Sequence, residues 1–166
     1  MWLIGVALIA IILARILFIA LMVACGVPHV VIERSVGQVY MRRWWILPRN
    51  NWCNIYLHQF LLSDEPRLHD HPYSWISIVL KGGYFENLYK RACRVVLPGS
   101  IRYGKATDLH YITLFPDWSK GNLRGTSLRP AWTIFITGRR KRDWGFLILD
   151  KWVPWRQVLR NGSEIC

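Results

Sequence analysis

Three histidines in this chain have the type and spacing that a metal site requires. His69 and His71 flank Asp70, and residues two apart in an extended strand project to the same face. Both imidazoles could therefore reach one ion, with Asp70 pointing away from it. A third ligand has to come from another strand, and His110 is the natural candidate. We predict a metal site of His69, His71 and His110, with His58 as a fourth ligand or a hydrogen-bonding neighbour.

The cofactor expected at such a site is one divalent metal ion, Fe, Zn or Ni. Three neutral imidazole nitrogens with open positions suit Zn²⁺ and a bound water, and imidazole also suits Fe²⁺ and Ni²⁺. Glu86 could complete the ligand set if its side chain faces inward. Glu86 and Asp70 are the nearby acids suited to general acid–base chemistry. Three tyrosines could line the pocket: Tyr73, Tyr84 and Tyr103.

A non-catalytic interpretation of the same histidines stays open. They could be hydrogen-bonded core residues of a binding or structural protein. No Gly-rich phosphate loop, nucleophile elbow or Ser-His-Asp order is present, which argues against nucleotide hydrolysis and serine-hydrolase chemistry. The reaction of an enzyme built on this site is therefore left undefined by the residues alone.

The elements that position these histidines are short strands. After Pro28 the apolar runs are brief and separated by turn signals such as Lys81-Gly82-Gly83. Many short strands with regular turns predict an all-β sandwich or barrel. We expect strands over residues 39–47, 54–62, 74–80, 83–89, 94–97, 101–103, 110–115, 132–137 and 145–149. A short helical turn is expected near residues 155–159.

These segments resemble the cupin superfamily. The first cupin motif, a His-x-His followed by a hairpin glycine, matches His69-Asp70-His71 and Gly82-Gly83, although Trp75 or Ile76 stands where the motif has a glutamate. The second motif survives as Pro98-Gly99 and the more distant His110. The resemblance implies a cupin-type double-stranded β-helix, also called a jelly-roll barrel. It also implies a homo-oligomer, and Fe²⁺ with O₂ is one option, by similarity to three-histidine cupins such as the thiol dioxygenases.

A narrower likeness is to uncharacterised cupin-like proteins of bacteria and tailed phages. It runs from about Tyr40 to Trp155 and rests on an ordered series of segments. The series is Leu57-His58-Gln59-Phe60, Leu68-His69-Asp70-His71-Pro72, Leu80-Lys81-Gly82-Gly83-Tyr84, Asp108-Leu109-His110, Trp132-Thr133 with Gly138, Trp144-Gly145-Phe146 and Trp152-Val153-Pro154-Trp155. Because one fold can host many activities, this likeness implies the fold and little about the reaction.

The start of the chain predicts a membrane anchor. Residues 2–25 are apolar with one charge, and about 20 apolar residues suffice to cross a bilayer. Basic residues are absent before this segment and frequent after it, which places the following domain in the cytoplasm. We therefore expect a transmembrane helix in residues 1–28 and a cupin-like domain in residues 29–166. Its first strand should begin near Val39, so the helix should contribute little to the core.

Two residues of this segment leave alternatives open. Arg15 lies near the middle of the span, where a charge is costly. It could snorkel, belong to a shifted helix, or face a partner helix in an oligomer. Met22-Val23-Ala24-Cys25 resembles a degenerate lipoprotein cleavage site. In that interpretation Cys25 is lipidated, and the domain lies outside the cytoplasm.

The charge of the chain indicates polyanionic surroundings. The net charge is +12, and the run Arg139-Arg140-Lys141-Arg142 follows Gly138. For a tethered domain, anionic lipid is the favoured contact of this run. Nucleic acid is not favoured, because neither a recognition helix nor a stacking motif accompanies the charge. The four cysteines form no paired motif and predict a reducing compartment without disulfides. The expected partners are therefore membrane lipid and a small-molecule ligand.

Overall fold

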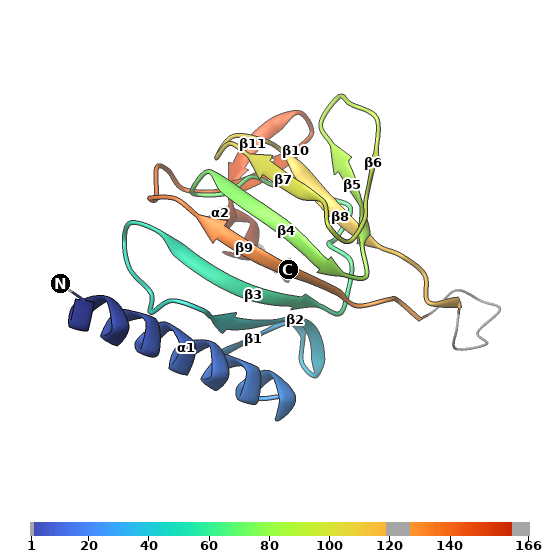
Figure 1. The fold of residues 1–166 in the computed structure, drawn as a ribbon. Helices are drawn as coiled ribbons and strands as arrows, with labels where there is room; N and C mark the ends of the chain where they lie inside the picture. The colour runs from blue at the N-terminus through green and yellow to red at the C-terminus, as the bar shows by residue number, and fades with distance from the viewer. Residues whose placement is uncertain (1, 119–126, 161–166) are drawn as a thin grey trace.

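The chain folds into a mainly β-stranded domain with a helix at each end (Figure 1). The structure, a computed structural model, describes residues 2–118 and 127–160. The helices are α1 (Trp2–Ala24) and α2 (Trp155–Arg160). The strands in this part of the chain are β1 (Val30–Ser35), β2 (Gln38–Trp45), β3 (Asn54–Phe60), β4 (Trp75–Lys81), β5 (Tyr84–Leu88), β6 (Arg94–Val96), β7 (Ile101–Gly104), β8 (His110–Leu114), β9 (Ala131–Thr137), β10 (Gly145–Ile148) and β11 (Lys151–Pro154). The all-β expectation for the domain is confirmed.

The strands form antiparallel sheets. The largest has the order β1-β2-β3-β9-β4-β7, and a smaller one has the order β6-β5-β8. The hairpin β10-β11 joins the smaller sheet through His69, which forms isolated bridges to both His110 and Phe146. The segment that carries the His-x-His motif therefore lies between β8 and β10 as a short additional strand.

The hydrophobic core lies between the two sheets. It combines residues of β4 and β9 with residues of β5, β6 and β8, and alternation along each strand turns these side chains inward. The buried members are Val79, Tyr84, Val96, Ile112, Leu114 and Ala131. The turn at Gly82-Gly83 carries the chain from β4 in one sheet to β5 in the other, and both glycines have positive φ. This packing fixes the frame on which the histidines are carried.

Two strands were absent from the sequence-based prediction. The strand β1 begins at Val30, well before Val39, and pairs with β2 through a turn in which Gly37 has φ +79°. The strand β11 was also missed. The short terminal helix α2 was expected. Three cysteines, Cys25, Cys53 and Cys93, are free and exposed, whereas Cys166 lies outside the described residues.

The helix α1 is in contact with the domain near its C-terminal end. Arg15 donates to two carbonyl oxygens at the end of β2, Trp45 O at 2.8 Å and Ile46 O at 3.2 Å. Ile19 is only 6% exposed, and Trp44 Nε1 donates to Val27 O at 2.9 Å. The expectation that this helix contributes little to the core is confirmed, because Ile19 is buried whereas Leu17 and Leu21 remain exposed. The contacts of Arg15 nevertheless join the helix to the end of β2. Arg15 finds its partners within its own chain.

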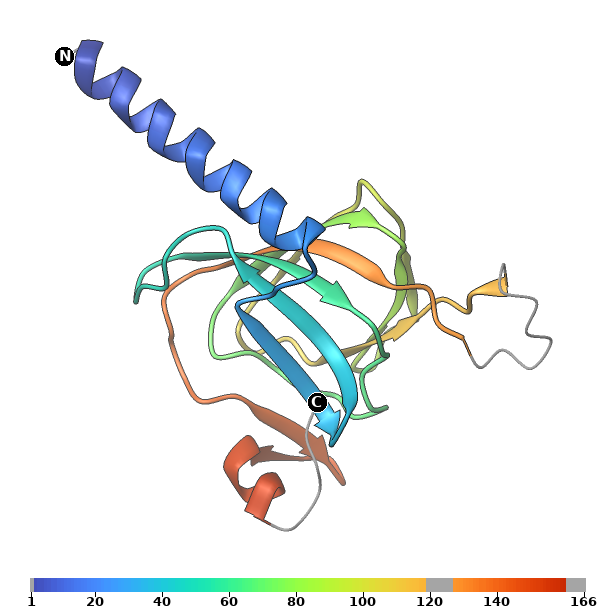
Figure 2. The ribbon, with the colours of Figure 1, turned by 90° about the horizontal axis from the view of Figure 1, so that it is seen from below.

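The first half of α1 projects beyond the sheets (Figure 2). By length and composition, residues 4–24 could cross a membrane, a test that a signal sequence near an N-terminus also passes. The large apolar side chains described in this half are exposed, including Ile9, Ile11 and Leu13. Such a surface is stable only against lipid, detergent or another apolar partner.

Candidate metal centre

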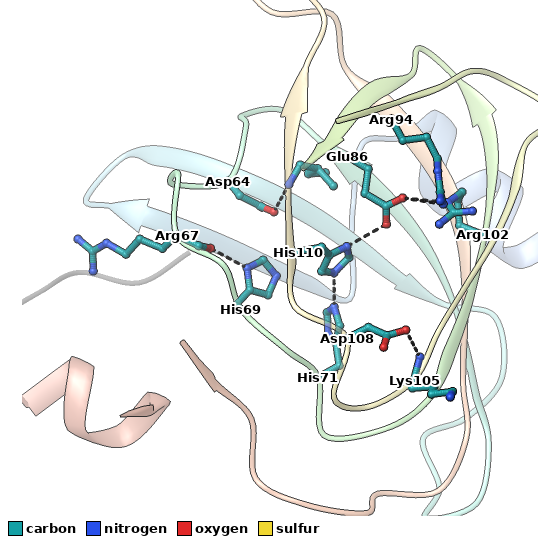
Figure 3. Close-up of polar contacts among 11 residues, drawn as sticks. Asp64, Arg67, His69, His71, Glu86, Arg94, Arg102, Lys105, Asp108 and His110 are labelled. Carbon is teal, nitrogen blue, oxygen red and sulfur yellow. Dashed lines mark hydrogen bonds and ion pairs between the residues drawn. The ribbon is translucent and has the colours of Figure 1, made fainter. Parts of the chain in front are cut away.

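The three predicted histidines converge on one point inside the domain (Figure 3). One ring nitrogen from each of His69, His71 and His110 lies within 4.8 Å of the other two. The closest pair is His71 Nε2 and His110 Nε2, which are 2.8 Å apart. The structure thus brings together all three residues that the sequence selected.

Backbone pairing explains this convergence. His69 and His110 exchange two hydrogen bonds, each N–H donating to the other's carbonyl oxygen at 3.0 Å. Residues paired in this way present their side chains on the same face. His71 N–H donates to Ala106 O at 3.3 Å, which continues the extended segment by two residues. The parity of His69 and His71 and the bridge to His110 together direct the three rings to one side.

Asp70 points away from the histidines and fastens this segment to the β10-β11 hairpin. Its carboxylate accepts from Gly145 N–H at 2.7 Å and from Trp152 Nε1 at 2.9 Å. Arg142 lies 3.1 Å from the same carboxylate. Burial raises the pKa of Asp70, and these partners partly offset that effect. The role of Asp70 is structural, because these contacts are with the hairpin and its preceding loop and not with the three histidines.

Glu86 faces inward and contacts His110 instead of joining the cluster of three histidines. Its carboxylate, only 2% exposed, accepts from His110 Nδ1 at 3.1 Å and from Arg102 Nε at 2.9 Å, and Arg94 lies at 3.6 Å (Figure 3). Burial raises the pKa of Glu86, but the hydrogen bond from His110 and the charge and hydrogen bond of Arg102 outweigh it, so the net shift is downward. Glu86 is therefore an ionised carboxylate placed to orient His110.

The hydrogen bonds of two histidines fix their tautomers. His110 carries its proton on Nδ1, because the Glu86 carboxylate can only accept. His69 Nδ1 lies 3.4 Å from Arg67 O, which likewise places its proton on Nδ1. Both rings then present an unprotonated Nε2. This arrangement, a ligating nitrogen opposite a hydrogen-bonded Nδ1–H, is the one that metal-binding histidines adopt.

The histidines line a small cavity. Its volume is about 120 Å³, and aromatic rings form much of its wall, including Trp75 and Phe135. Burial lowers the pKa of His69, and burial with the neighbouring histidines lowers that of His71 well below the usual value. Both rings are therefore neutral near pH 7, as a metal ligand must be.

The other sequence candidates divide between this cavity and the surface. His58, Tyr73 and Tyr84 line the cavity. Tyr103 does not, because it is 59% exposed and lines a separate pocket on the far side of His110. His58 is buried, and it neighbours the three histidines without belonging to their cluster.

Sequence reasoning missed two polar residues of the cavity, Arg43 and Asp64. Arg43 Nε donates to His58 Nε2 at 2.9 Å across the β2–β3 pair. Asp64 accepts from Ile112 N–H at 2.7 Å and from the Tyr40 hydroxyl. Alternation along β2 does not identify Arg43, because residues of both parities are buried in this strand, Tyr40 and Met41 among them. Asp64 stands in a turn segment, where no pattern marks it as buried.

We predict that the free energy of unfolding falls as the pH drops below about 6.5. Burial, and secondarily the charge of Arg43, lowers the pKa of His58 well below its usual 6.5. As the pH falls, His58 is therefore protonated in the unfolded chain while it is still neutral in the folded chain. Each such histidine contributes a slope of about 1.4 kcal/mol per pH unit. Denaturant titrations of chelator-treated protein at several pH values between 5 and 7 measure this dependence of the unfolding free energy on pH. His58→Gln should make it shallower, and an unchanged slope would contradict the assignment.

Comparisons with known proteins give likenesses of fold. No protein family matches this sequence, and neither does any curated protein. Among solved structures, a cupin-like protein from Thermotoga maritima is 15% identical, with a TM-score of 0.48 over 75% of this chain and 85% of that one. The DMSP lyase DddQ from Ruegeria pomeroyi is 14% identical, with a TM-score of 0.47 over 63% of this chain. KdgF from a Halomonas species is 15% identical, with a TM-score of 0.45 over 61% of this chain and 82% of that one.

These likenesses do not assign a reaction. This chain spans 49% of the lyase, and none of the three TM-scores reaches 0.5. A shared architecture at this level leaves activity and substrate undetermined. The function therefore has to be argued from the site itself.

Proposed function

We propose that this protein is a membrane-anchored metallocupin. His69, His71 and His110 bind one divalent metal ion, Fe, Zn or Ni, and the cavity beside them admits a small molecule on which the centre acts. The cupin assignment is supported by the His-x-His motif between β8 and β10, and by the inter-sheet turn at Gly82-Gly83.

The observation that carries this proposal is the three-nitrogen cluster itself. Two ligands of one ion, each about 2.0–2.1 Å from it, are separated by roughly 3–3.5 Å. The 2.8 Å between His71 and His110 approaches that separation, and all three nitrogens fall within 4.8 Å. A small rotation of one imidazole ring away from the other would make room for an ion. The donor set therefore fits a metal of the zinc or iron type.

The residues of the chain define what happens around the ion. A bound metal would supply Lewis-acid activation of a water or ligand oxygen, or redox chemistry if it is iron. Glu86 keeps the proton of His110 on Nδ1, and Asp70 fixes the backbone of the motif. Aromatic rings form much of the cavity wall, so a bound molecule would displace water from a largely apolar surface.

A second function is favoured by one observation. The 2.8 Å between His71 and His110 is also hydrogen-bond length, with His71 Nε2–H donating to His110 Nε2. Glu86 would continue the same chain of hydrogen bonds. In that case the histidines form a polar core network, and the protein binds ligands or partners without metal or catalysis.

Metal analysis separates the two functions. We predict about one equivalent of Fe, Zn or Ni in full-length protein purified in a neutral detergent without added metal or chelator. Mass-spectrometric elemental analysis measures it. His29→Gln is a matched control, because His29 lies in the link between α1 and β1 and outside the cluster, so the metal should be retained. Protein that stays metal-free after incubation with each of the three ions supports the hydrogen-bonded network instead.

The proposed lipid contact rests on α1 more than on the basic run. Arg142 is paired with buried Asp70, and Arg140 is paired with Asp143. Lys141 Nζ donates to Ser74 Oγ at 3.2 Å. The run therefore does not present four unpaired charges to a membrane. We propose that the exposed apolar side chains of α1 provide the anchor, with the domain on the cytoplasmic side.

A further inference from the structure

A groove lined by arginines adjoins the histidine cavity. Its volume is about 660 Å³, and β1, β2, β3 and the loops before β3, β4 and β10 form it. Arg43 and Tyr73 line both the groove and the histidine cavity. The two spaces therefore share a wall formed by these two residues.

The charge of this groove has one sign. Four arginines line it, namely Arg43, Arg49, Arg139 and Arg140, and its lining contains neither Asp nor Glu. Arg140 is paired with Asp143. In the part of the chain that the structure describes, no Asp or Glu carboxylate forms an ion pair with Arg43, Arg49 or Arg139. Three like charges around one groove attract an anion and repel a cation.

Aromatic rings hold these arginines in place. The guanidinium of Arg43 lies 4.9 Å from the ring centre of Tyr56, and that of Arg49 lies 5.9 Å from Trp45. Arg139 lies 5.0 Å from the ring centre of exposed Trp52. Such contacts use the planar face of a guanidinium. The N–H groups at its edge stay available to bind carboxylate or phosphate oxygens in pairs.

His58 adds a donor on the cavity side. Its Nε2 accepts from Arg43 Nε, so its proton is on Nδ1. That Nδ1 is buried and has no hydrogen-bond partner among the described residues. Buried donors in native proteins are seldom left unpaired. An oxygen of a bound molecule is the kind of acceptor that would satisfy it.

We propose that the groove binds the anionic group, a carboxylate or a phosphate, of the molecule on which the centre acts. Arg43, Arg49 and Arg139 contact this group, and the rest of the molecule extends past Tyr73 into the cavity, where His58 Nδ1–H donates to an oxygen. The ligand is therefore a small organic acid or phosphate ester. This inference rests on the proposed function for the placement of the reacting part, whereas the anion site itself needs no metal.

The test measures anion binding by the full-length protein in a neutral detergent after chelator treatment. Malonate and inorganic phosphate are titrated by calorimetry at constant ionic strength. The double variant Arg49→Gln/Arg139→Gln should bind both probes at least about tenfold more weakly, since each exposed charge-assisted contact is worth a few fold. Both side chains are exposed, so the fold should survive. Arg156→Gln is the control, because Arg156 stacks on Trp155 in α2, outside the groove.

The outcomes separate this inference from the metal assignment. Unchanged affinities in the double variant, or an equal loss in Arg156→Gln, would overturn the anion site whatever the metal content. A selective loss supports it even if the histidines bind no metal. Native mass spectrometry with added phosphatidylglycerol identifies the source of the anion. A lipid adduct lost only in the double variant indicates a headgroup, and an adduct equal in all three proteins indicates a soluble anion.

Discussion

His71→Ala should lower the affinity of the protein for its metal by about 1000-fold, because it removes one of the three proposed protein ligands. Glu86→Gln should lower it by a smaller factor, about 10–100-fold, the range found when an outer hydrogen-bond partner of a ligand is changed. The glutamine can still accept from His110 Nδ1–H, but it no longer offers a negative charge. Competition with a chromophoric chelator measures both affinities.

The order of these two effects is the informative result. His29→Gln should bind metal as tightly as the unmodified protein, because it changes a histidine outside the cluster. If His71→Ala binds metal as tightly as the unmodified protein, the three histidines do not form the metal site. If Glu86→Gln is as damaging as His71→Ala, Glu86 is itself a ligand, and its place beside His110 has been misinterpreted.

Gly82→Ala should destabilise the domain by about 4 kcal/mol or prevent folding. A Cβ at this position would lie 2.2 Å from Pro130 O and 3.0 Å from Ala131 Cα, and the backbone has φ +82°. Both contacts are with backbone atoms, which cannot move without separating β4 from β9. Overpacking of this kind is among the few mechanisms that give such large effects. Thermal unfolding should show a midpoint lowered by about 10 °C or more.

Gly99→Ala provides the matched comparison. Gly99 has a similar φ of +88°, but a Cβ there meets nothing within 4 Å. Its cost should be about 1 kcal/mol, the conformational penalty alone. Equal losses in the two variants would show that φ, and not the contact with Pro130, explains the requirement for glycine at Gly82.

Strand β8 shows how alternation allows a strand to be located from the sequence. The pattern of β8 alternates buried and partly buried residues along its whole length, and its position was predicted within one residue. The burial of β1 alternates between partly buried and exposed residues over its first four positions, but Val30, Val31 and Ile32 are three apolar residues in a row, so the sequence shows no apolar–polar alternation there. Gly37 forms the turn of the β1–β2 hairpin.

The part of the candidate site that depends on strand parity was predictable from the sequence. His69 and His71 share a face by local geometry, and His110 was chosen as the remaining histidine nearby. The contact between Glu86 and His110 depends on the register between β5 and β8, in which Glu86 pairs with Ile112. The position of Arg43 at the wall of a cavity depends on the curvature of the sheet. Neither quantity is encoded by spacing along the chain.

The hydrogen bonds of Arg15 limit the depth to which the protein could enter a bilayer. Residues 2–14 precede this contact, and as a helix they extend about 20 Å, less than the roughly 30 Å of a hydrocarbon core. While Arg15 holds the end of β2, an inserted α1 would draw the loop between β2 and β3 to the lipid headgroups. Arg49 and the exposed Trp52 lie in that loop. The groove lined by Arg43, Arg49 and Arg139 would then open at the membrane surface, within reach of molecules that partition there instead of in the bulk solution.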